Sequence, residues 1–429
     1  MVVALHDGLI CHGSVLEQRQ RLEVIGTDAG GLAALPAAAL RLVQQAELVA
    51  GPARLLAQLP PDQQRLATEQ PQQACQQLAE AWQAGRRAVL LASGDPLWFG
   101  IGRLLLQYFD AADLRFHPAP SSLQLAFARI GRPWQDARWV SLHGREPEPL
   151  AAELQQRPSA LAVLTDPGQG GVEEVRRTLA ALGLEAAYAL WLCERLGHPQ
   201  ERVQQLAPTA ALPADLDPLH LVLLLAQPPA AISPTALPLF GIADGQFLQH
   251  HDHPGLMTKR EVRVQLLADL ELPQRGVLWD LGAGTGSVGL EALRLCPGLE
   301  LWAVERRSGG AALVRANAER LGVSPAAVLE GEALQLLAQM PTPQRVLLGG
   351  GGRQRAALLQ AVIERLAPGG LVVIPLATLE PVAELRPLLE AAGWRVSLTQ
   401  LNISRGVPLA GGLRLAPLNP VLVLRGCQR

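Results

Sequence analysis

A glycine-rich loop after a short apolar run is the feature of this 429-residue chain that most clearly points to chemistry. In the stretch WDLGAGTGSVGLEAL, Asp280 comes two residues before the first of three glycines, Gly282, Gly284 and Gly286, and Thr285 lies between the last two. The preceding residues have the pattern of a buried strand and the following ones that of a helix. Such a loop lets the backbone approach a ligand at the carboxyl end of the strand, where open α/β sheets bind nucleotides. The loop therefore predicts a nucleotide-like cofactor.

Two cofactors fit this loop. Read from Gly284, the letters GTGSVG match the dinucleotide fingerprint, in which a pyrophosphate sits on the helix N-terminus. Against that reading, Asp280 would face the pyrophosphate, and like charges in a partly desolvated cleft repel by on the order of several kcal/mol. S-adenosylmethionine carries an ammonium and a sulfonium but no phosphate, so the carboxylate favours this methyl donor. A tight turn in which Asp280 only caps the helix is the remaining alternative.

Two more strand ends carry acids. Glu305 ends the next strand-like run, about 20 residues after Gly286, where a carboxylate can accept hydrogen bonds from both ribose hydroxyls. Glu332 and Ala333 follow the third strand-like run, where an adenine edge would lie. Both cofactors can be bound by an acid that contacts the ribose, so Glu305 alone does not distinguish between them. Asp280 and Glu305 together favour S-adenosylmethionine.

Composition narrows the function classes. The chain has 37 basic and 39 acidic residues without a basic block, so we do not expect nucleic acid as a partner. Its five cysteines show neither zinc nor disulfide spacing, which predicts reduced thiols, no metal site and a cytoplasmic location. We also find no signal peptide and no 18-residue apolar run, and so expect a soluble protein without a membrane segment.

Apolar runs of strand length alternate with amphipathic stretches of helix length, which is the pattern of βαβ units in an α/β protein. We expect strands at 22–26, 47–51, 87–93, 160–165, 186–193, 220–226, 276–281, 299–304, 344–348, 370–375, 394–401 and 420–425, and helices at 71–84, 172–182, 258–270, 286–296, 308–321, 353–366 and 379–392. The last two strands have only a Gly/Pro-rich segment between them, which predicts an antiparallel end to a parallel sheet.

A proline-rich segment, QPPAAISPTALP, separates two such series and predicts a linker. The expected organisation is an N-terminal extension (1–20), a first domain (21–226), the linker (227–239) and a second domain (240–429).

Both domains resemble known families. Residues 240–429 resemble the decarboxylating methyltransferase domain of cobalamin biosynthesis through LMTKREVR, WDLGAGTGSVGLEAL, AVER, GEA, LLGGGG and NPVLV. Residues 21–226 resemble the tetrapyrrole methylase family through VIGTDAGGLAAL, ASGDPLWFGIG, PAPSSLQLAFARIGRPWQDA, VSLHGR and LVLLL. The resemblance implies two α/β subdomains in the first domain and a Rossmann-like class I methyltransferase with a seven-stranded sheet in the second.

The same resemblance implies an activity. A fusion in this order resembles enzymes of vitamin B12 biosynthesis that methylate C5 and C15 of precorrin-6B, or its cobalt form, and remove carbon dioxide from the C12 acetate. It implies one S-adenosylmethionine site in each domain, a tetrapyrrole substrate and a homo-oligomer.

The resemblance places the first donor site at Gly94, Asp95, Ser121 and Ser122. This agrees with the residue types, because Gly94 ends a buried run and Asp95 can accept hydrogen bonds from an ammonium or a hydroxyl. Helix capping is the alternative for Asp95 and for the serines. The family's first loop is usually G-x-G-P, whereas residues 26–30 here read Gly-Thr-Asp-Ala-Gly.

Three further residues are candidates for binding the substrate. His143 and Arg145 can bind carboxylates of a macrocycle or move a proton, although a histidine satisfied by the backbone is an equal alternative. Arg353 follows four glycines and can bind a carboxylate or simply begin a solvated helix.

The motif MTKREVR adds two candidates. Thr258 resembles a cofactor contact, and its alternative role is a helix N-cap that Glu261 completes as a capping box. Lys259 is the only lysine in the chain, which suggests that a compact ammonium matters at this position, and we group it with the candidate substrate residues.

The implied chemistry needs no strong general base, because an enamine-like ring carbon is already nucleophilic and the macrocycle can delocalise the carbanion left by carbon dioxide. No catalytic residue is therefore singled out. Two alternatives remain: a nicotinamide- or flavin-dependent oxidoreductase, and a non-catalytic scaffold whose first donor site is lost through the altered loop at 26–30.

Overall fold

The computed structural model describes residues 20–142, 148–207, 210–250, 252–349, 352–409 and 412–428. Contacts between these residues divide the chain into two compact units. The first holds the described chain up to Pro133 together with Cys193–Val203, and the second holds Trp134–Leu192 and the chain from Gln204 onward. None of the helices described is both long enough and apolar enough to cross a membrane.

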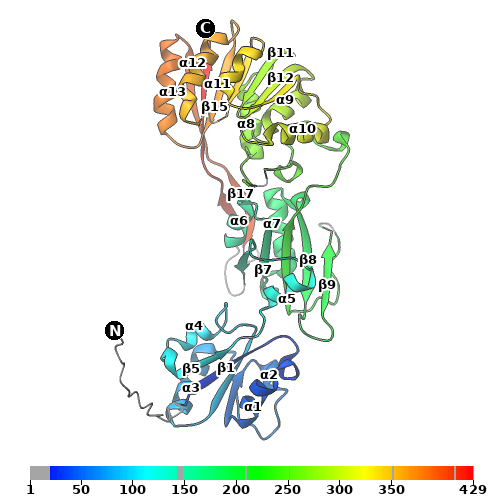
Figure 1. Ribbon diagram of the computed structural model, residues 1–429, viewed down its shortest axis with the longest axis vertical. Coiled ribbons are helices and arrows are strands. Elements are labelled where there is room, and N and C mark those ends of the chain that lie inside the picture. The colour runs from blue at the N-terminus through cyan, green and yellow to red at the C-terminus, as the bar shows by residue number, and fades with distance from the viewer. Residues whose placement is uncertain are drawn as a thin grey trace, which may run out of the picture. The chain divides into compact units, whose positions relative to one another are not determined.

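The first unit is built on a parallel five-stranded sheet in the order β3–β2–β4–β1–β5 (Figure 1). Its elements are β1 (Leu22–Thr27), α1 (Ala37–Gln45), β2 (Leu48–Gly51), α2 (Ala53–Leu56), β3 (Arg65–Ala67), α3 (Pro71–Gln83), β4 (Ala88–Ser93), α4 (Gly102–Leu105), β5 (Leu114–His117) and α5 (Ser122–Arg129). Successive side chains of a strand point to opposite faces, so Leu90 packs in the core with α3 and α4, and Leu91 in the core with α1 and α2. Burial on both faces explains why the central strands are continuous apolar runs.

A second five-stranded sheet has the order β6–β7–β10–β8–β9, with β6 parallel and β10 antiparallel to β7. The elements are β6 (Arg138–Ser141), α6 (Glu148–Gln155), β7 (Ala160–Leu164), α7 (Gly171–Leu182), β8 (Tyr188–Glu194), β9 (Arg202–Leu206) and β10 (His220–Ala226). Leu150 and Leu154 of α6 share one core with Val172 and Val175 of α7, so both helices cover the same face of this sheet.

The third sheet has seven strands in the order β13–β12–β11–β14–β15–β19–β16, and β19 runs opposite to the other six. Its elements are α8 (Arg260–Asp269), β11 (Arg275–Leu281), α9 (Ser287–Leu295), β12 (Gly298–Glu305), α10 (Gly310–Leu321), β13 (Ala327–Glu330), α11 (Ala333–Leu336), β14 (Arg345–Leu348), α12 (Arg355–Arg365), β15 (Leu371–Leu376), α13 (Glu380–Ala391), β16 (Arg395–Leu401) and β19 (Val421–Cys427). Helices α8, α9 and α10 pack on one face, and α12 and α13 on the other (Figure 1). The seven-stranded sheet with an antiparallel end is therefore confirmed.

Every expected strand and helix is present, with ends within two residues of the expected ones. The segment between the last two expected strands differs, because it forms a separate hairpin of β17 (Ser404–Leu409) and β18 (Gly412–Pro417). Val407 and Ala416 of this hairpin are buried in the core that contains α7. The hairpin therefore ties the third sheet to the second within the same unit.

The proline-rich segment at 227–239 has definite contacts with the third sheet's helices. Arg294, in the last turn of α9, donates to the carbonyl oxygens of Pro234 (3.1 Å) and Pro238 (3.1 Å) and to that of Leu321 (2.7 Å). The segment lacks a long regular element, as expected, yet Arg294 of α9 and Arg320 of α10, which donates to Ala230 O (2.9 Å), hold parts of it against these helices.

A buried ion network joins the start of the second domain to α8, α9 and the hairpin. The Arg263 side chain is fully buried and donates to Glu291 (3.0 Å) and Asp244 (2.8 Å). Arg405 of β17 donates to Asp244 (2.9 Å), to Glu261 (2.7 Å) and to a carbonyl at the end of α7. Buried charges are normally paired in this way.

Replacing Arg263 with methionine is expected to lower the free energy of unfolding by about 3–5 kcal/mol, because Asp244 and Glu291 would lose a buried partner. Urea denaturation followed by tryptophan fluorescence measures this loss. The control is Arg386→Met, which removes an exposed pair with Glu390 and should cost less than about 1 kcal/mol. Equal losses in the two variants would contradict the importance of the buried network.

Candidate functional site

The glycine loop after β11 has the tight backbone course that its sequence predicts. Gly282, Gly284 and Gly286 all have positive φ angles (82°, 59° and 77°). A Cβ at Gly282 would lie only 2.1 Å from the carbonyl oxygen of Gly349, the residue that directly follows the neighbouring strand β14. At Gly284 no atom of the described residues comes within 4 Å of such a Cβ, so this glycine borders open space. The loop therefore requires glycine at 282 and leaves room for a ligand at 284.

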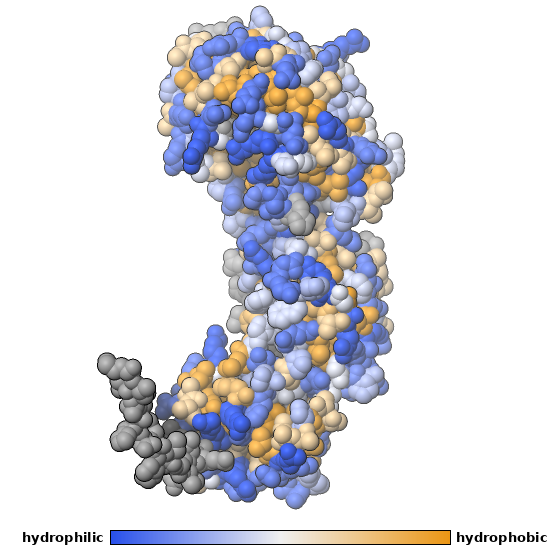
Figure 2. Space-filling model, in the orientation of Figure 1, coloured by the Kyte–Doolittle hydropathy of each residue, from blue (hydrophilic) through white to orange (hydrophobic). Residues whose placement is uncertain are grey.

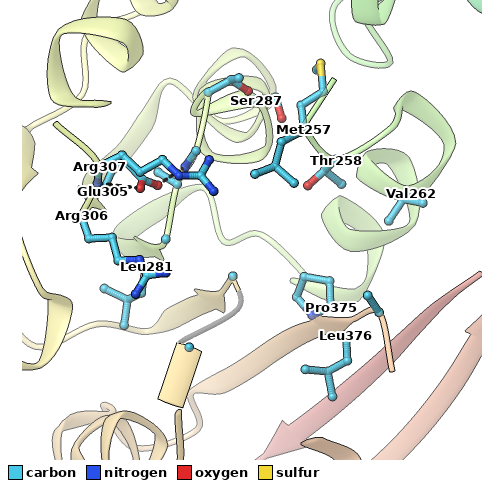
Figure 3. Close-up of a pocket in the computed structure, with 18 of the residues that line it drawn as sticks. Met257, Thr258, Val262, Leu281, Ser287, Glu305, Arg306, Arg307, Pro375 and Leu376 are labelled. Atoms are coloured by element: carbon cyan, nitrogen blue, oxygen red, sulfur yellow. Dashed lines mark hydrogen bonds between the residues drawn. The ribbon is translucent and has the colours of Figure 1, made fainter. Parts of the chain in front are cut away.

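This loop borders a cavity of about 790 Å³, a size typical of small-molecule sites. Figure 3 shows Glu305, Arg306 and Arg307 on one side of the cavity, Met257 and Thr258 on another, and Pro375 and Leu376 at the end of β15. The residues predicted from the sequence that line it are Thr258, Lys259, Gly282, Gly284, Thr285, Glu305, Glu332 and Ala333. The structure thus brings together residues from 258 to 333 at one edge of the sheet.

Glu305 places a carboxylate in the cavity wall. It ends β12, and its Oε2 accepts a hydrogen bond from the Gly284 amide (2.7 Å), while its Oε1 accepts one from the Arg307 amide (3.0 Å). The side chain is only 6% exposed, so these bonds hold both the loop and the carboxylate in place. A carboxylate fixed at the end of the second strand can accept hydrogen bonds from ribose hydroxyls.

The Thr285 hydroxyl is positioned to bind a ligand. Its Oγ1 is buried and has no hydrogen-bond partner among the described residues, although the residue lines the cavity. Buried hydroxyls are nearly always hydrogen-bonded in native structures, so an unpaired one at a cavity indicates a bound group. The lining mixes apolar side chains with polar and charged ones, and the fixed Glu305 carboxylate and the unpaired Thr285 hydroxyl in it fit the ribose and polar groups of S-adenosylmethionine.

The structure corrects the expected position of Asp280. Its carboxylate is 2% exposed, does not line the cavity, and accepts a hydrogen bond from the Gly289 amide of α9 (3.2 Å). A Cβ at Gly289 would lie 2.8 Å from Asp280 Oδ2, so glycine there makes space for the buried acid. Burial, with a contribution from Glu305, raises the pKa of Asp280 to about 7, and the Gly289 hydrogen bond opposes this rise. Asp280 supports the loop from beneath, and Glu305 is the acid that faces the cavity.

The remaining candidates of the second domain separate into two groups. Thr258 does not cap α8: Lys259 is the N-cap residue without a side-chain cap bond, so the capping box is absent and the Thr258 side chain is free to line the cavity. Gly286 lies outside the lining, where a Cβ would be 2.9 Å from Val314 Cγ1 of α10. Arg353 is exposed and also lies outside the lining, although its neighbour Gly352 belongs to it.

In the first unit, two strand ends meet at the predicted donor motif. The Gly94 amide donates to the Thr27 carbonyl (2.6 Å), and a Cβ at Gly26 would lie 2.0 Å from Gly94 O. A Cβ at Gly94 would touch the Ser121 Cα (3.4 Å), so residues 26, 94 and 121 are neighbours. Figure 2 shows apolar side chains at the surface of this unit near α4. Leu97 and Phe99, which follow the motif in the sequence, are both exposed.

Local hydrogen bonds occupy part of this motif. Asp95 Oδ1 accepts from the Leu97 amide (2.9 Å), and Ser121 forms a capping box with Gln124 at the start of α5. Ser122 is the first residue of that helix. The capping alternative therefore holds for Ser121, and it is compatible with a ligand nearby. His143 and Arg145 lie outside the described residues.

Some lining residues could not be expected from the motifs. Pro375 and Leu376 end β15, and the rule that ligands lie at carboxyl ends of parallel strands could have found them. Gln155 and Gln156, at the end of α6, carry no such signal because they belong to the other resemblance.

Comparison with known proteins gives two family matches. Residues 21–209 match the model of the tetrapyrrole (corrin/porphyrin) methylases, and residues 249–427 match that of the precorrin methyltransferase domain.

Two curated relatives match over most of the chain, and a third matches less than half of it. The chain is 34% identical over 406 residues to a precorrin-6Y C(5,15)-methyltransferase [decarboxylating] of Sinorhizobium sp, covering 93% of this chain and 94% of that protein. It is 28% identical over 411 residues to the Mycobacterium tuberculosis protein of the same name, covering 93% and 97%. A probable cobalt-precorrin-6B C(15)-methyltransferase (decarboxylating) of Pyrobaculum aerophilum is 37% identical over 186 residues, covering 43% of this chain and 94% of that protein. All three are named as methyltransferases and none as an oxidoreductase.

Changing Glu305 to glutamine is expected to weaken S-adenosylmethionine binding about tenfold to a hundredfold, because hydrogen bonds to a charged group contribute about 1.5–3 kcal/mol. Calorimetric titration of the full chain measures the dissociation constant. Glu300→Gln is the matched control, since Glu300 lies exposed on the same strand. Equal affinities in the Glu305 variant and the wild type would contradict a ligand contact.

The pH dependence of stability tests the buried state of Asp280. Its folded pKa of about 7 lies above the unfolded value near 3.8, so the folded chain keeps a proton that the unfolded chain has lost between those pH values. Stability from this group is therefore lost as pH rises through that window. In Asp280→Asn this loss of stability should be absent. The unfolding temperature of the variant should therefore rise relative to that of the wild type as the pH increases from 5 to 8. Parallel curves for the two proteins would show that Asp280 is ionised when folded.

Proposed function

Because this chain belongs to the decarboxylating precorrin-6Y C(5,15)-methyltransferase family, we propose that it methylates C5 and C15 of precorrin-6B or its cobalt form and releases carbon dioxide from the C12 acetate. It is an S-adenosylmethionine-dependent methyltransferase of cobalamin biosynthesis. The observation that carries the proposal is the cavity at the glycine loop, where Glu305 holds the Gly284 amide beside the unpaired Thr285 hydroxyl.

We assign the activities to two modules, each with its own donor site. The Pyrobaculum relative is named for C15 alone and matches over 186 residues, less than half of this chain. This supports C15 methylation and decarboxylation in the second domain (240–429), which carries the precorrin methyltransferase match. The first domain (21–226), joined by the linker 227–239, then methylates C5.

In the second domain the chain's residues mainly orient the reactants. S-adenosylmethionine supplies a methyl group made electrophilic by its sulfonium. Glu305 would accept the ribose hydroxyls, Thr285 Oγ1 has a free hydrogen-bonding position, and Gly284 leaves room for the ligand beside the loop. Orientation of two bound reactants can supply about 7–11 kcal/mol of the barrier. An enamine-like macrocycle carbon provides the electron pair, so the cavity needs no strong base.

Decarboxylation makes a similar demand. The electrons of the breaking C–C bond enter the conjugated macrocycle, carbon dioxide leaves, and the remaining carbon then takes up a proton to become a methyl group. The protein has to hold the acetate so that this bond is aligned with the conjugated system, which is a task of shape and orientation. The cavity wall has apolar side chains that can pack against one edge of the macrocycle: Met257, Val262, Leu281, Pro375 and Leu376.

In the first domain, Gly94 and Ser121 lie against each other at the carboxyl ends of β1 and β4. The altered loop still brings Gly26 against Gly94, and Asp28 Oδ1 accepts a hydrogen bond from the Gly30 amide (2.9 Å), so the aspartate is turned back onto its own loop. We therefore keep the first module as a donor site in this proposal.

Variants of the full chain should separate the two activities. Asp95→Ala is expected to reduce C5 methylation at least about tenfold while decarboxylation and C15 methylation continue, because the second module is intact. Mass spectrometry and NMR of the product from precorrin-6B identify which carbons were methylated. Asp110→Ala, an exposed acid in the same unit, is the control. Unchanged C5 methylation in Asp95→Ala would contradict the first site, and a wild type without two methyl gains and one loss of carbon dioxide would contradict the function itself.

A further inference from the structure

One wall of the cavity in the second domain (240–429) is formed by residues that belong, in sequence, to the first domain (21–226). Ala152, Gln155 and Gln156, in α6 and just after it, line the cavity together with the loop Gly255–Lys259. The two segments touch: a Cβ at Gly255 would lie 3.0 Å from the Gln155 carbonyl oxygen. Both segments belong to the same compact unit, so this wall is a fixed part of the site.

Lys259 lies where these two segments meet. Its Nζ donates to the Gly255 carbonyl oxygen (3.0 Å), which uses one of the three ammonium hydrogens. No carboxylate of the described residues forms an ion pair with it, and the residue lines the cavity. Two hydrogens of a partly buried ammonium are thus left for a ligand.

The charged side chains around Lys259 carry one more positive than negative charge, and neither Lys259 nor Arg157 is bonded to an acid among the described residues. In the described part of the chain, the cluster consists of Arg157, Lys259, Arg263 and Arg405 against Asp244, Glu261 and Glu291. Arg263 and Arg405 are bonded to all three acids, and Arg157 is 9% exposed and shares a hydrogen bond with Tyr188. Buried charges are normally paired, so this excess of positive charge beside a cavity calls for an anion from outside the chain.

The ionisation of Lys259 agrees with this picture. Burial is the main cause that lowers the pKa of Lys259, and the neighbouring Arg157, Arg405 and Arg263 add to it, while Asp244 opposes them. A bound carboxylate would reverse this effect by favouring the charged ammonium.

We propose that Lys259 and Gln155 form a carboxylate-binding subsite that holds an acetate or propionate side chain of the tetrapyrrole in the second domain's cavity. Gln155 contributes a carboxamide that makes no hydrogen bond with another described residue, at the wall supplied by α6. This inference rests on the proposed function and deepens it, because it makes α6 part of the substrate site of the other module.

The carboxylate held here is a spectator and not the one that is lost. An ammonium paired with the reacting carboxylate would stabilise the ground state more than the transition state, since the negative charge moves into the macrocycle as the bond breaks. Pairing with a non-reacting side chain instead fixes the orientation of the ring. Lys259 is therefore a substrate-binding residue whose loss should act on affinity.

Lys259→Met in the full chain is expected to weaken binding of precorrin-6B about tenfold to a hundredfold, measured by absorbance titration without methyl donor, and to raise KM for C15 methylation by a similar factor with kcat little changed. Gln155→Ala should weaken binding about twofold to tenfold, because a neutral hydrogen bond contributes less. Affinity for S-adenosylmethionine and the rate of C5 methylation should remain as in the wild type.

Arg260→Met is the matched control, since it removes the next cation along the chain, which is exposed and outside the lining. Precorrin binding unchanged within twofold in Lys259→Met would overturn the subsite, and so would a parallel loss of methyl-donor affinity, which would place Lys259 in the donor site. A wild type that neither binds nor converts precorrin-6B would instead overturn the proposed function.

Discussion

A contact between two strand ends that leaves no room for a side chain underlies both candidate donor sites. In the second domain the Gly349 amide donates to Leu281 O (2.7 Å), and a Cβ at Gly282 would lie 2.1 Å from Gly349 O. In the first unit the Gly94 amide donates to Thr27 O (2.6 Å), and a Cβ at Gly26 would lie 2.0 Å from Gly94 O. Each contact joins the ends of neighbouring parallel strands, β11 with β14 and β1 with β4. The chain must turn sharply at this point, which exposes backbone groups to a ligand at the carboxyl edge of the sheet.

The central strands could be predicted from the sequence because they are buried on both faces and are therefore continuous apolar runs. The strands for which the sequence gives no bounds include β3, β5, β6, β9 and β13, which are short edge strands of the three sheets. An edge strand is paired on one side only and partly exposed, so it needs no apolar run. The hairpin β17–β18 also escaped prediction, since its glycines and prolines indicate turns and only its packing on α7 makes it a regular element.

Part of the cavity lining could be predicted from motifs at strand ends. Gly282, Gly284 and Glu305 line one cavity together with Thr258, which precedes α8, whereas Gly286 lies outside the lining. The sequence places an acid near the loop, but it does not say toward which face of the sheet the Asp280 side chain points. In the structure this side chain lies under α9, where Gly289 leaves space for it and donates a hydrogen bond to it. The wall from α6 could not be foreseen at all, since it depends on how the hairpin and Arg405 hold α7 and α8 together. The wall of one module's cavity thus depends on packing between elements that resemble two different families.

The most direct test of this account is a crystal structure of the full chain with S-adenosylhomocysteine. The account predicts density for the nucleoside in the cavity beside Gly284, with the ribose hydroxyls within hydrogen-bond distance of the Glu305 carboxylate. A cavity left empty while the nucleoside binds elsewhere in the second domain, or a dinucleotide retained from the cell with its diphosphate on the glycine loop, would contradict it.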